Sequence, residues 1–254
     1  VELRGYGMMP TGEPLLALEL IEGVNLETAL ANGVRYDAAG VRALALALAQ
    51  GLAAIHSAGV VHRHFKPANV MVLRDGGIKI VDFGISRLLD LEQTRLTAAG
   101  AFLGSPATVA PEQIDDSHAA GPPADMYALG ATLYWLLTGR APYRGLLPEG
   151  LEQHRRAPVP ELPDHGGLGP LVRRLLQKNP AVRPTAAEVV RLLGGRPAKD
   201  PSTVAFGLLL LLVVVGGALL TLRFAGGRKA PVAPLPAATG PSVVERPRAV
   251  TPSP

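Results

Sequence analysis

The sequence contains no cysteine among its 254 residues, so disulfide bonds and thiolate metal sites are excluded. This absence leaves the redox compartment of the protein open. Aromatic residues are also scarce, with one Trp, five Tyr and five Phe. No basic stripe with interleaved aromatic residues occurs in the body of the chain, so the sequence argues against nucleic-acid binding.

Most of the chain carries equal numbers of basic and acidic residues. The sequence holds 25 Lys and Arg against 21 Asp and Glu, and five of these basic residues and one acidic residue follow Leu222. The part before them therefore carries 20 residues of each sign, and the net charge of +4 belongs to the C-terminal end. The first residue is Val1 rather than Met, which indicates a processed N-terminus or a fragment.

One long hydrophobic run is present near the C-terminus. Val204 to Leu222 is an uncharged stretch, close to the roughly 20 residues that a helix needs to cross a bilayer. We therefore expect a transmembrane helix at residues 203–222, after a linker at 195–202. Basic residues flank it on both sides, so charge does not decide its orientation. The proline-rich residues 223–254 are predicted to form a disordered tail.

The remaining sequence predicts strands first, then a hairpin, then mainly helices. Leu15–Leu20 is a short apolar run that indicates a buried strand. Apolar residues spaced by three or four between Val41 and Ile55 predict an amphipathic helix, with Asp37 as N-cap and Gly59 just beyond its end. Asn69 to Gly84 contains two β-branched runs around Asp75-Gly76-Gly77, which predicts a hairpin. We expect three further helices at 125–137, 168–179 and 185–195.

Three polar residues flank the predicted hairpin. Lys66 and Asn69 precede its first strand, and Asp82 follows its second, so a tight hairpin brings them together. Asp and Asn offer the oxygen ligands that Mg²⁺ prefers, and Lys offers a positive charge for a phosphate. The residues alone therefore indicate a candidate Mg²⁺–nucleotide site, although ordinary turn chemistry would explain each of them separately.

The order of several short motifs is more specific. "HRHFKPANV", "KIVDFG", "GSPATVAPEQ", "DMYALG", "LLTGRAPY" and "NPAVRPTAAEV" follow one another in a series that resembles the protein-kinase signature motifs. The chain resembles bacterial transmembrane serine/threonine kinases of the eukaryotic type over residues 1–194. The resemblance implies an α+β kinase-like fold, mostly the α-rich C-terminal lobe with the end of the N-lobe sheet, followed by the membrane helix.

The resemblance also implies roles for individual residues. Asn69 and Asp82 correspond to the metal-binding residues, with ATP and Mg²⁺ as cofactors, and Lys66 to the lysine that steadies the transferring phosphate. Leu18 corresponds to the gatekeeper at the adenine, with the backbones of Glu19 and Ile21 beside it. The following residues are expected to be structural or regulatory: His62 and Phe83 in the apolar spine, Asp125 bonded to the catalytic loop, Glu112 paired with Arg183, Arg63 facing a phosphate on Thr94 or Thr97, and Ser105 where the family usually has an acceptor-selecting Thr.

Two features depart from the family pattern. His64 occupies the place of the aspartate that accepts the substrate proton, and a neutral imidazole there has one acceptor and no negative charge. The second departure is that residues 1–20 reach the hinge-like segment without a glycine-rich loop, a strand lysine or a helix glutamate. We therefore expect the chain to lack phosphoryl transfer, and we expect His64→Asp alone not to restore it.

These features leave the enzymatic status uncertain. The expected function is that of a membrane-anchored serine/threonine-kinase family member, inactive or severely impaired, with its kinase-like domain in the cytosol and a protein as substrate or signalling partner. The alternative is a pseudokinase scaffold that binds nucleotide without transfer. A fragment of an active kinase, a base change at codon 64, an unfolded pseudogene product and a homodimer all stay open.

Overall fold

The computed structural model describes residues 1–11, 14–82, 106–115, 120–145 and 148–196. Phe83, Thr94, Thr97, Ser105, the expected membrane helix and the expected tail lie outside these residues. The strands are β1 (Leu3–Met8), β2 (Pro14–Leu18), β3 (Gly23–Asn25), β4 (Val70–Leu73) and β5 (Ile78–Ile80). The helices are α1 (Leu26–Ala31), α2 (Ala38–Ser57), α4 (Pro111–Asp115), α5 (Pro122–Thr138), α6 (Glu149–Arg156), α7 (Leu168–Leu175) and α8 (Ala186–Leu192), with 3₁₀ turns η1 (Pro67–Asn69), η2 (Pro106–Thr108) and η3 (Pro180–Val182).

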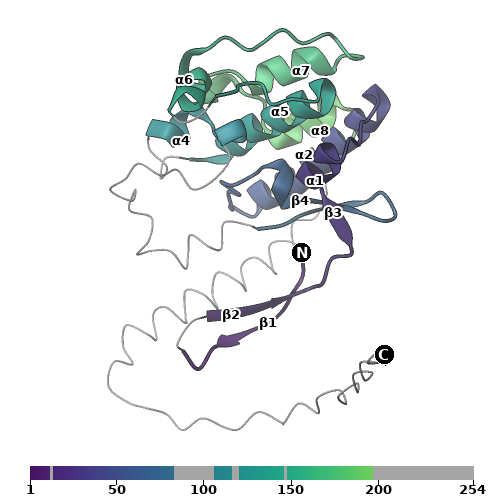
Figure 1. Cartoon of the computed structure of the whole chain (residues 1–254), viewed down its shortest axis with the longest axis vertical. Coiled ribbons are helices and arrows are strands. Elements are labelled where there is room, and N and C mark those ends of the chain that lie inside the picture. Colours follow the sequence, from purple (N-terminus) through teal and green to yellow (C-terminus); the bar gives the residue numbers. More distant parts are fainter. Residues whose placement is uncertain (12–13, 83–105, 116–119, 146–147, 197–254) are drawn as a thin grey trace, which may run out of the picture. The chain divides into compact units, whose positions relative to one another are not determined.

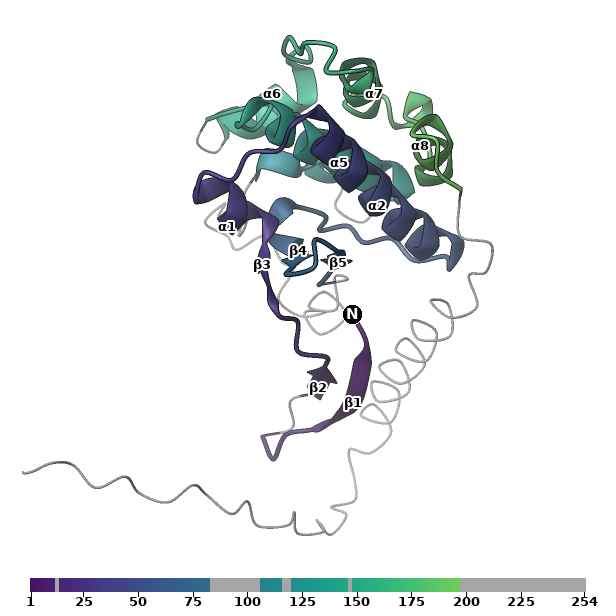
Figure 2. The ribbon, with the colours of Figure 1, turned by 90° about the vertical axis from the view of Figure 1, so that its right-hand side faces the viewer.

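Helix α2 confirms its prediction closely. The side chain of Asp37 accepts a hydrogen bond from the Gly40 amide at 2.7 Å and caps the helix. Gly59, just beyond the helix, has φ +74°, a conformation that glycine adopts without penalty. Among the described residues, α2 is the one helix long and apolar enough to cross a membrane. Its buried face packs against α5 and α8, however, so it serves as a core helix (Figures 1 and 2).

Helix α5 lies at the centre of the core because it is apolar on nearly every side. It packs against both α2 and α7 (Figure 1). At Gly130 a Cβ atom would lie 2.7 Å from the Leu175 Cβ, so the close approach to α7 requires glycine there. The helix begins three residues earlier than predicted, since Pro122 suits a first helical turn, and ends at Gly139 with φ +75°.

The strands form two small sheets. β1 and β2 pair antiparallel, and β3, β4 and β5 form an antiparallel sheet in that order. The hairpin of β4 and β5 confirms its prediction, because Asp75 Oδ1 accepts from the Gly77 amide and Gly76 takes φ +83°.

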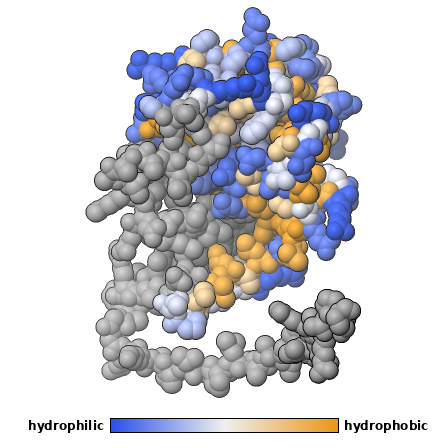
Figure 3. Space-filling view, viewed as in Figure 1, coloured by the Kyte–Doolittle hydropathy of each residue, from blue (hydrophilic) through white to orange (hydrophobic). Residues whose placement is uncertain are grey.

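The strand predicted at Leu15–Leu20 is present as β2, but the prediction that it is buried is wrong. Leu15 and Leu18 are about half exposed and Leu20 is 91% exposed. β2 pairs only with β1 among the described strands, so the packing that would bury these side chains is missing there. Hydrophobic residues of this region are visible on the surface in Figure 3.

A buried polar cluster joins α5, α6 and the segment after α7. The Tyr127 hydroxyl lies 2.9 Å from His154 Nδ1, and Lys178 Nζ donates to the Tyr143 hydroxyl at 2.9 Å and to the His154 carbonyl at 2.7 Å. The Lys178 ammonium also lies 4.2 Å from the centre of the Tyr143 ring. Burial, together with this ammonium, lowers the pKa of His154 to about 4, so its ring is neutral in the folded protein.

The lowered pKa of His154 predicts a loss of stability in acid. The unfolded chain takes up the histidine proton near its ordinary pKa of 6.5, whereas the folded chain does so only near 4. The free energy of unfolding should therefore keep its full value above pH 6.5 and fall by about 2–3 kcal/mol as the pH drops to 4. Urea titrations at several pH values should show a loss smaller by about 2 kcal/mol in His154→Gln. Equal losses in wild type and variant would contradict this assignment.

Candidate functional site

The segment Val60–Asn69 follows α2 and carries His64, and its backbone is held from α5. The buried carboxylate of Asp125 accepts from the His62 amide at 2.8 Å and from the Arg63 amide at 2.7 Å. Arg63 has φ +66°, a conformation rare for a residue with a Cβ, so these hydrogen bonds hold an unfavourable turn. The predicted contact of Asp125 with the catalytic loop is confirmed.

His56 also contacts this carboxylate, which sequence reasoning missed. Its Nε2 lies 2.9 Å from Asp125 Oδ2, so one buried carboxylate joins the end of α2 to the loop. In the sequence His56 is an ordinary basic residue in the last turn of a helix, and that position favours it by itself. His56 and Asp125 are 69 positions apart in the sequence, so only the folded structure reveals their contact.

His62 is fully buried below the loop. Its Nε2 lies 3.1 Å from the Val81 carbonyl, and its ring meets the Phe65 ring edge to face at 5.7 Å. Burial lowers the pKa of His62, although the nearby Asp125 opposes the shift. The side chain therefore acts as a neutral packing group, in agreement with the expected burial; Phe83, its expected neighbour, lies outside the described residues.

The β4–β5 hairpin brings Asn69 and Asp82 together. The strands pair Val70 with Ile80, and the Val81 amide then donates to the Asn69 carbonyl at 2.9 Å, so the residues at the open end lie opposite each other. Asn69 Nδ2 lies 3.4 Å from Asp82 Oδ2. Asp82 is exposed and takes φ +60°, which Asp tolerates better than most residues. The convergence inferred from the hairpin is therefore present for these two residues.

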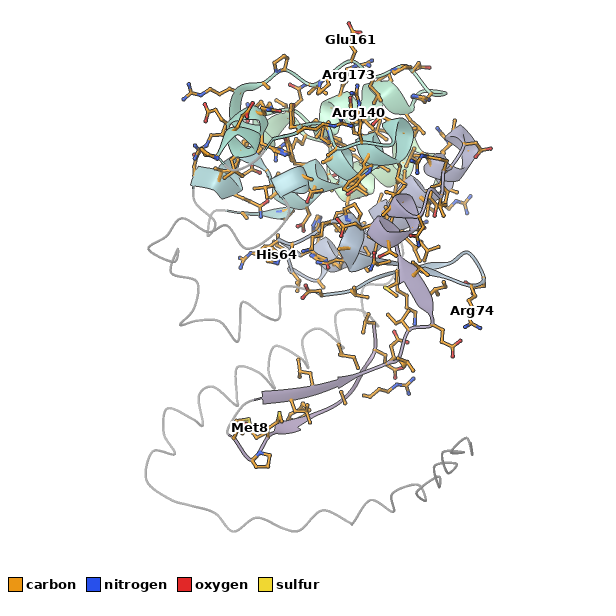
Figure 4. The ribbon with its side chains drawn as sticks, in the orientation of Figure 1. Met8, His64, Arg74, Arg140, Glu161 and Arg173 are labelled. Carbon is orange, nitrogen blue, oxygen red and sulfur yellow. The ribbon has the colours of Figure 1, made fainter. Side chains whose placement is uncertain are left out.

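The backbone of His64 contacts Asn69, one member of this pair. Its carbonyl accepts from Asn69 Nδ2 at 2.9 Å, and its side chain is exposed. Figure 4 shows His64 on the loop between α2 and β4, at the edge of the helical part. The amide nitrogen of Asn69 thus serves two acceptors, which leaves Oδ1 as the Asn69 atom that suits a cation.

The oxygen atoms of Asn69 and Asp82 suit Mg²⁺ better than a metal ion whose ligands all come from the protein. The described residues contain no cluster of three His, Asp or Glu side chains that could hold a metal. The exposed Asp82 carboxylate and the amide oxygen of the largely buried Asn69 match a cation that keeps several waters and binds substrate phosphates. Lys66 immediately precedes η1, and its carbonyl accepts from the Asn69 amide at 2.9 Å.

The hinge-like segment is tied to the same hairpin. Glu19 accepts from Lys79 Nζ on β5 at 2.5 Å and from the Glu2 amide at 2.9 Å, and these bonds lower the pKa of its carboxyl. Leu18 ends β2 with an exposed side chain, and Ile21 is half-buried. The predicted adenine-side residues therefore adjoin the strand that leads to Asp82.

Glu112 and Arg183 form the expected pair. The guanidinium donates to both carboxylate oxygens, at 2.6 and 2.9 Å, and the Arg183 side chain is fully buried. The remaining N–H groups donate to the carbonyls of Pro123, Gln177 and Lys178. The pair therefore fixes α4 to α5 and to the segment after α7.

Comparison with known proteins shows the family. The family model of the protein kinase domain matches residues 6–192. Probable serine/threonine-protein kinase PkwA of Thermomonospora curvata is 38% identical over 186 residues, which cover 72% of this chain and 24% of PkwA. Serine/threonine-protein kinase AfsK of Streptomyces coelicolor is 36% identical over 179 residues (69% of this chain, 22% of AfsK), and PknL of Mycobacterium tuberculosis is 39% identical over 132 residues (52% and 32%). The chain belongs to the bacterial eukaryotic-type serine/threonine protein kinase family.

The match covers only part of each relative. The aligned residues span between 22% and 32% of the length of these three proteins. The activity, substrates and partners of the whole protein are therefore matters for proposal.

Proposed function

We propose that this chain is a membrane-anchored member of the kinase family that binds Mg²⁺–ATP and does not transfer its γ-phosphate. The observation that carries the proposal is the residue at position 64. Asp125 holds the loop and Asn69 lies beside Asp82, contacts that agree with the roles expected from the family motifs, whereas His64 stands where the family pattern has the carboxylate that receives the acceptor proton.

The replacement removes what the transfer step requires. The family aspartate orients the acceptor hydroxyl with two oxygens and a negative charge. A neutral imidazole offers one acceptor, and a protonated imidazole would add positive charge beside the metal and Lys66. His64 therefore lacks the negative charge and the second acceptor oxygen of the family aspartate.

Nucleotide binding uses different atoms. Mg²⁺, when bound, neutralises the phosphates, and Asp82 Oδ and Asn69 Oδ1 are the groups that would hold it. Lys66 would supply a positive charge near the phosphates. Leu18 and the backbones of Glu19 and Ile21 would line the adenine side. None of these roles requires a carboxylate at position 64.

The hydrophobic run near the C-terminus and the resemblance to transmembrane kinases support a proposal about the surroundings of the domain. Residues 203–222 would anchor the chain, with the kinase-like domain in the cytosol where ATP is available. The partner would be a protein, as substrate or as a signalling component. The second candidate is a transferring serine/threonine kinase, which the identity to kinases and the presence of Lys66, Asn69 and Asp82 favour.

One experiment separates the two candidates. The full chain in detergent micelles is titrated with a fluorescent ATP analogue, with and without Mg²⁺, and the same samples are tested for transfer of labelled phosphate to the chain and to a basic protein. We expect Mg²⁺-dependent binding that weakens at least about tenfold in Asp82→Asn, a loss of about 1.4 kcal/mol. We expect no transfer by the wild type or by His64→Asp, because residues 1–254 hold neither a glycine-rich phosphate loop nor a strand lysine.

Asp75→Asn is the matched control, since it makes the same charge change at the opposite end of the same hairpin. Its affinity should equal that of the wild type. Transfer by the wild type that disappears in Asp82→Ala would establish an active kinase, and a wild type that binds no nucleotide would refute the binding half of the proposal. Rescue by His64→Asp alone would show that the missing elements matter less than we infer.

A further inference from the structure

We infer that Gln113 is a positioning residue that couples helix α4 to the loop carrying His64 and, through that loop, to the Asn69–Asp82 pair. The coupling to Asn69 and Asp82 rests on the proposed nucleotide function; the contact between α4 and the loop does not. Gln113 belongs to the "APEQ" motif, in which Glu112 pairs with Arg183, and the proposed function gives Gln113 no role.

The Gln113 side chain bridges two backbone segments. Its Nε2 donates to the Arg63 carbonyl at 2.9 Å, across 50 residues of sequence. Its Oε1 accepts from the Ala110 amide at 3.1 Å, in the turn that leads into α4. The donor and the acceptor of one amide are thus used in opposite directions, which fixes the orientation of the side chain.

The α4 end of this bridge is firmly held. Glu112, the preceding residue, is clamped by the buried Arg183 guanidinium through two hydrogen bonds. Because the backbone of α4 is anchored, the Gln113 side chain can hold the loop that carries Arg63 in place. Gln113 therefore transmits the position of α4 rather than adjusting to the loop.

The loop end of the bridge is the residue with the unfavourable backbone. Arg63 has φ +66°, its amide is held by Asp125 and its carbonyl by Gln113. The two contacts come from different helices, α5 and α4, and hold opposite ends of the same residue. Loss of either one allows Arg63 to relax toward an ordinary conformation, which rotates the peptide that follows.

That peptide leads directly to the proposed metal site. The next carbonyl, that of His64, accepts from Asn69 Nδ2 at 2.9 Å, and the same nitrogen lies 3.4 Å from Asp82 Oδ2. A path of hydrogen bonds, joined by the covalent backbone of Arg63 and His64, therefore runs from Gln113 to Asn69 and Asp82. If nucleotide binding orders this site, it also favours the loop position that Gln113 holds, and the effect is reciprocal.

The test uses two variants of Gln113 and one control. Gln113→Glu keeps an acceptor for the Ala110 amide and removes the donor to Arg63, whereas Gln113→Ala removes both. Gln177→Ala is the matched control, because that exposed amide also donates to a backbone carbonyl, at 3.1 Å from Arg173. The full chain is studied by hydrogen–deuterium exchange without nucleotide, with peptides from α7 as an internal reference for global unfolding.

We expect the His62 and Arg63 amides to exchange at least threefold to tenfold faster in both Gln113 variants, with α7 and the Gln177→Ala chain unchanged. Unchanged exchange in Gln113→Glu would overturn the coupling, even if Gln113→Ala exchanges faster.

The Mg²⁺-dependent affinity for the fluorescent ATP analogue should also fall threefold to tenfold in Gln113→Glu. If the wild type and Gln113→Glu bind the ATP analogue equally well, the inferred coupling of Gln113 to Asn69 and Asp82 is wrong. Failure of the wild type to bind would refute the proposed function, and the exchange result would still decide the link between α4 and the loop.

Discussion

Replacement of Arg183 by methionine is expected to lower the free energy of unfolding by about 3–5 kcal/mol, the cost of removing one partner of a buried ion pair. The arginine side chain is fully buried and donates to both oxygens of Glu112. Methionine fills much of the same volume without donors, so the variant leaves a carboxylate that is only 19% exposed without its partner. Three backbone carbonyls also lose a donor.

The chain offers its own probe and control for this prediction. Trp135, the single tryptophan, lies on α5 and reports unfolding in urea by its fluorescence. Arg191→Met makes the same substitution on the exposed side of α8 and should change the free energy of unfolding by less than about 0.5 kcal/mol. A loss below about 1 kcal/mol in Arg183→Met would show that the pair contributes little beyond its desolvation cost.

Asp125→Ala is expected to lower the free energy of unfolding by about 3 kcal/mol and to release the loop that carries His64. The variant leaves the buried His62 amide and the partly buried Arg63 amide without an acceptor, at about 1–3 kcal/mol for a fully buried unsatisfied group. It also removes the partner of His56. Because this support helps to hold Arg63 at a positive φ, its backbone should relax as well.

The measurement pairs urea unfolding with exchange at residues 62 and 63. Asp164→Ala is the control: that aspartate accepts one backbone hydrogen bond, from Gly167 at 3.0 Å, on an exposed loop. Its loss should remain below about 1 kcal/mol. Equal losses in the two variants, or protected amides at 62 and 63 in Asp125→Ala, would contradict the role assigned to Asp125.

The elements whose signals are local could be predicted well. Asp37, the apolar spacing of α2 and Gly59 act within one or two helical turns, so the helix and both of its ends follow from neighbouring residues. The Asp75–Gly77 turn defines its hairpin in the same way. The Glu112–Arg183 pair was predicted through the order of family motifs rather than from any local rule.

The burial of β2 could not be read from its composition. An apolar run predicts that a strand can be buried, but burial requires a partner surface, and β2 has only β1 among the described strands. Leu20, at 91% exposure, shows how far composition and packing can differ. The same argument explains the long apolar α2, whose partners α5 and α8 make it a core helix.

The sequence by itself determined the family, helices α2, α5, α7 and α8, the ends of α2, the hairpin and the substitution at position 64, because each is encoded in adjacent residues or in the order of motifs. Only the tertiary structure decided that His56 joins Asp125, that Gln113 holds the Arg63 carbonyl and that Lys178 lies over Tyr143. These contacts join residues separated by 69, 50 and 35 positions. No local preference selects such partners, since they meet only when α2, α4 and α5 have packed and the loops between them have been fixed by their buried hydrogen bonds.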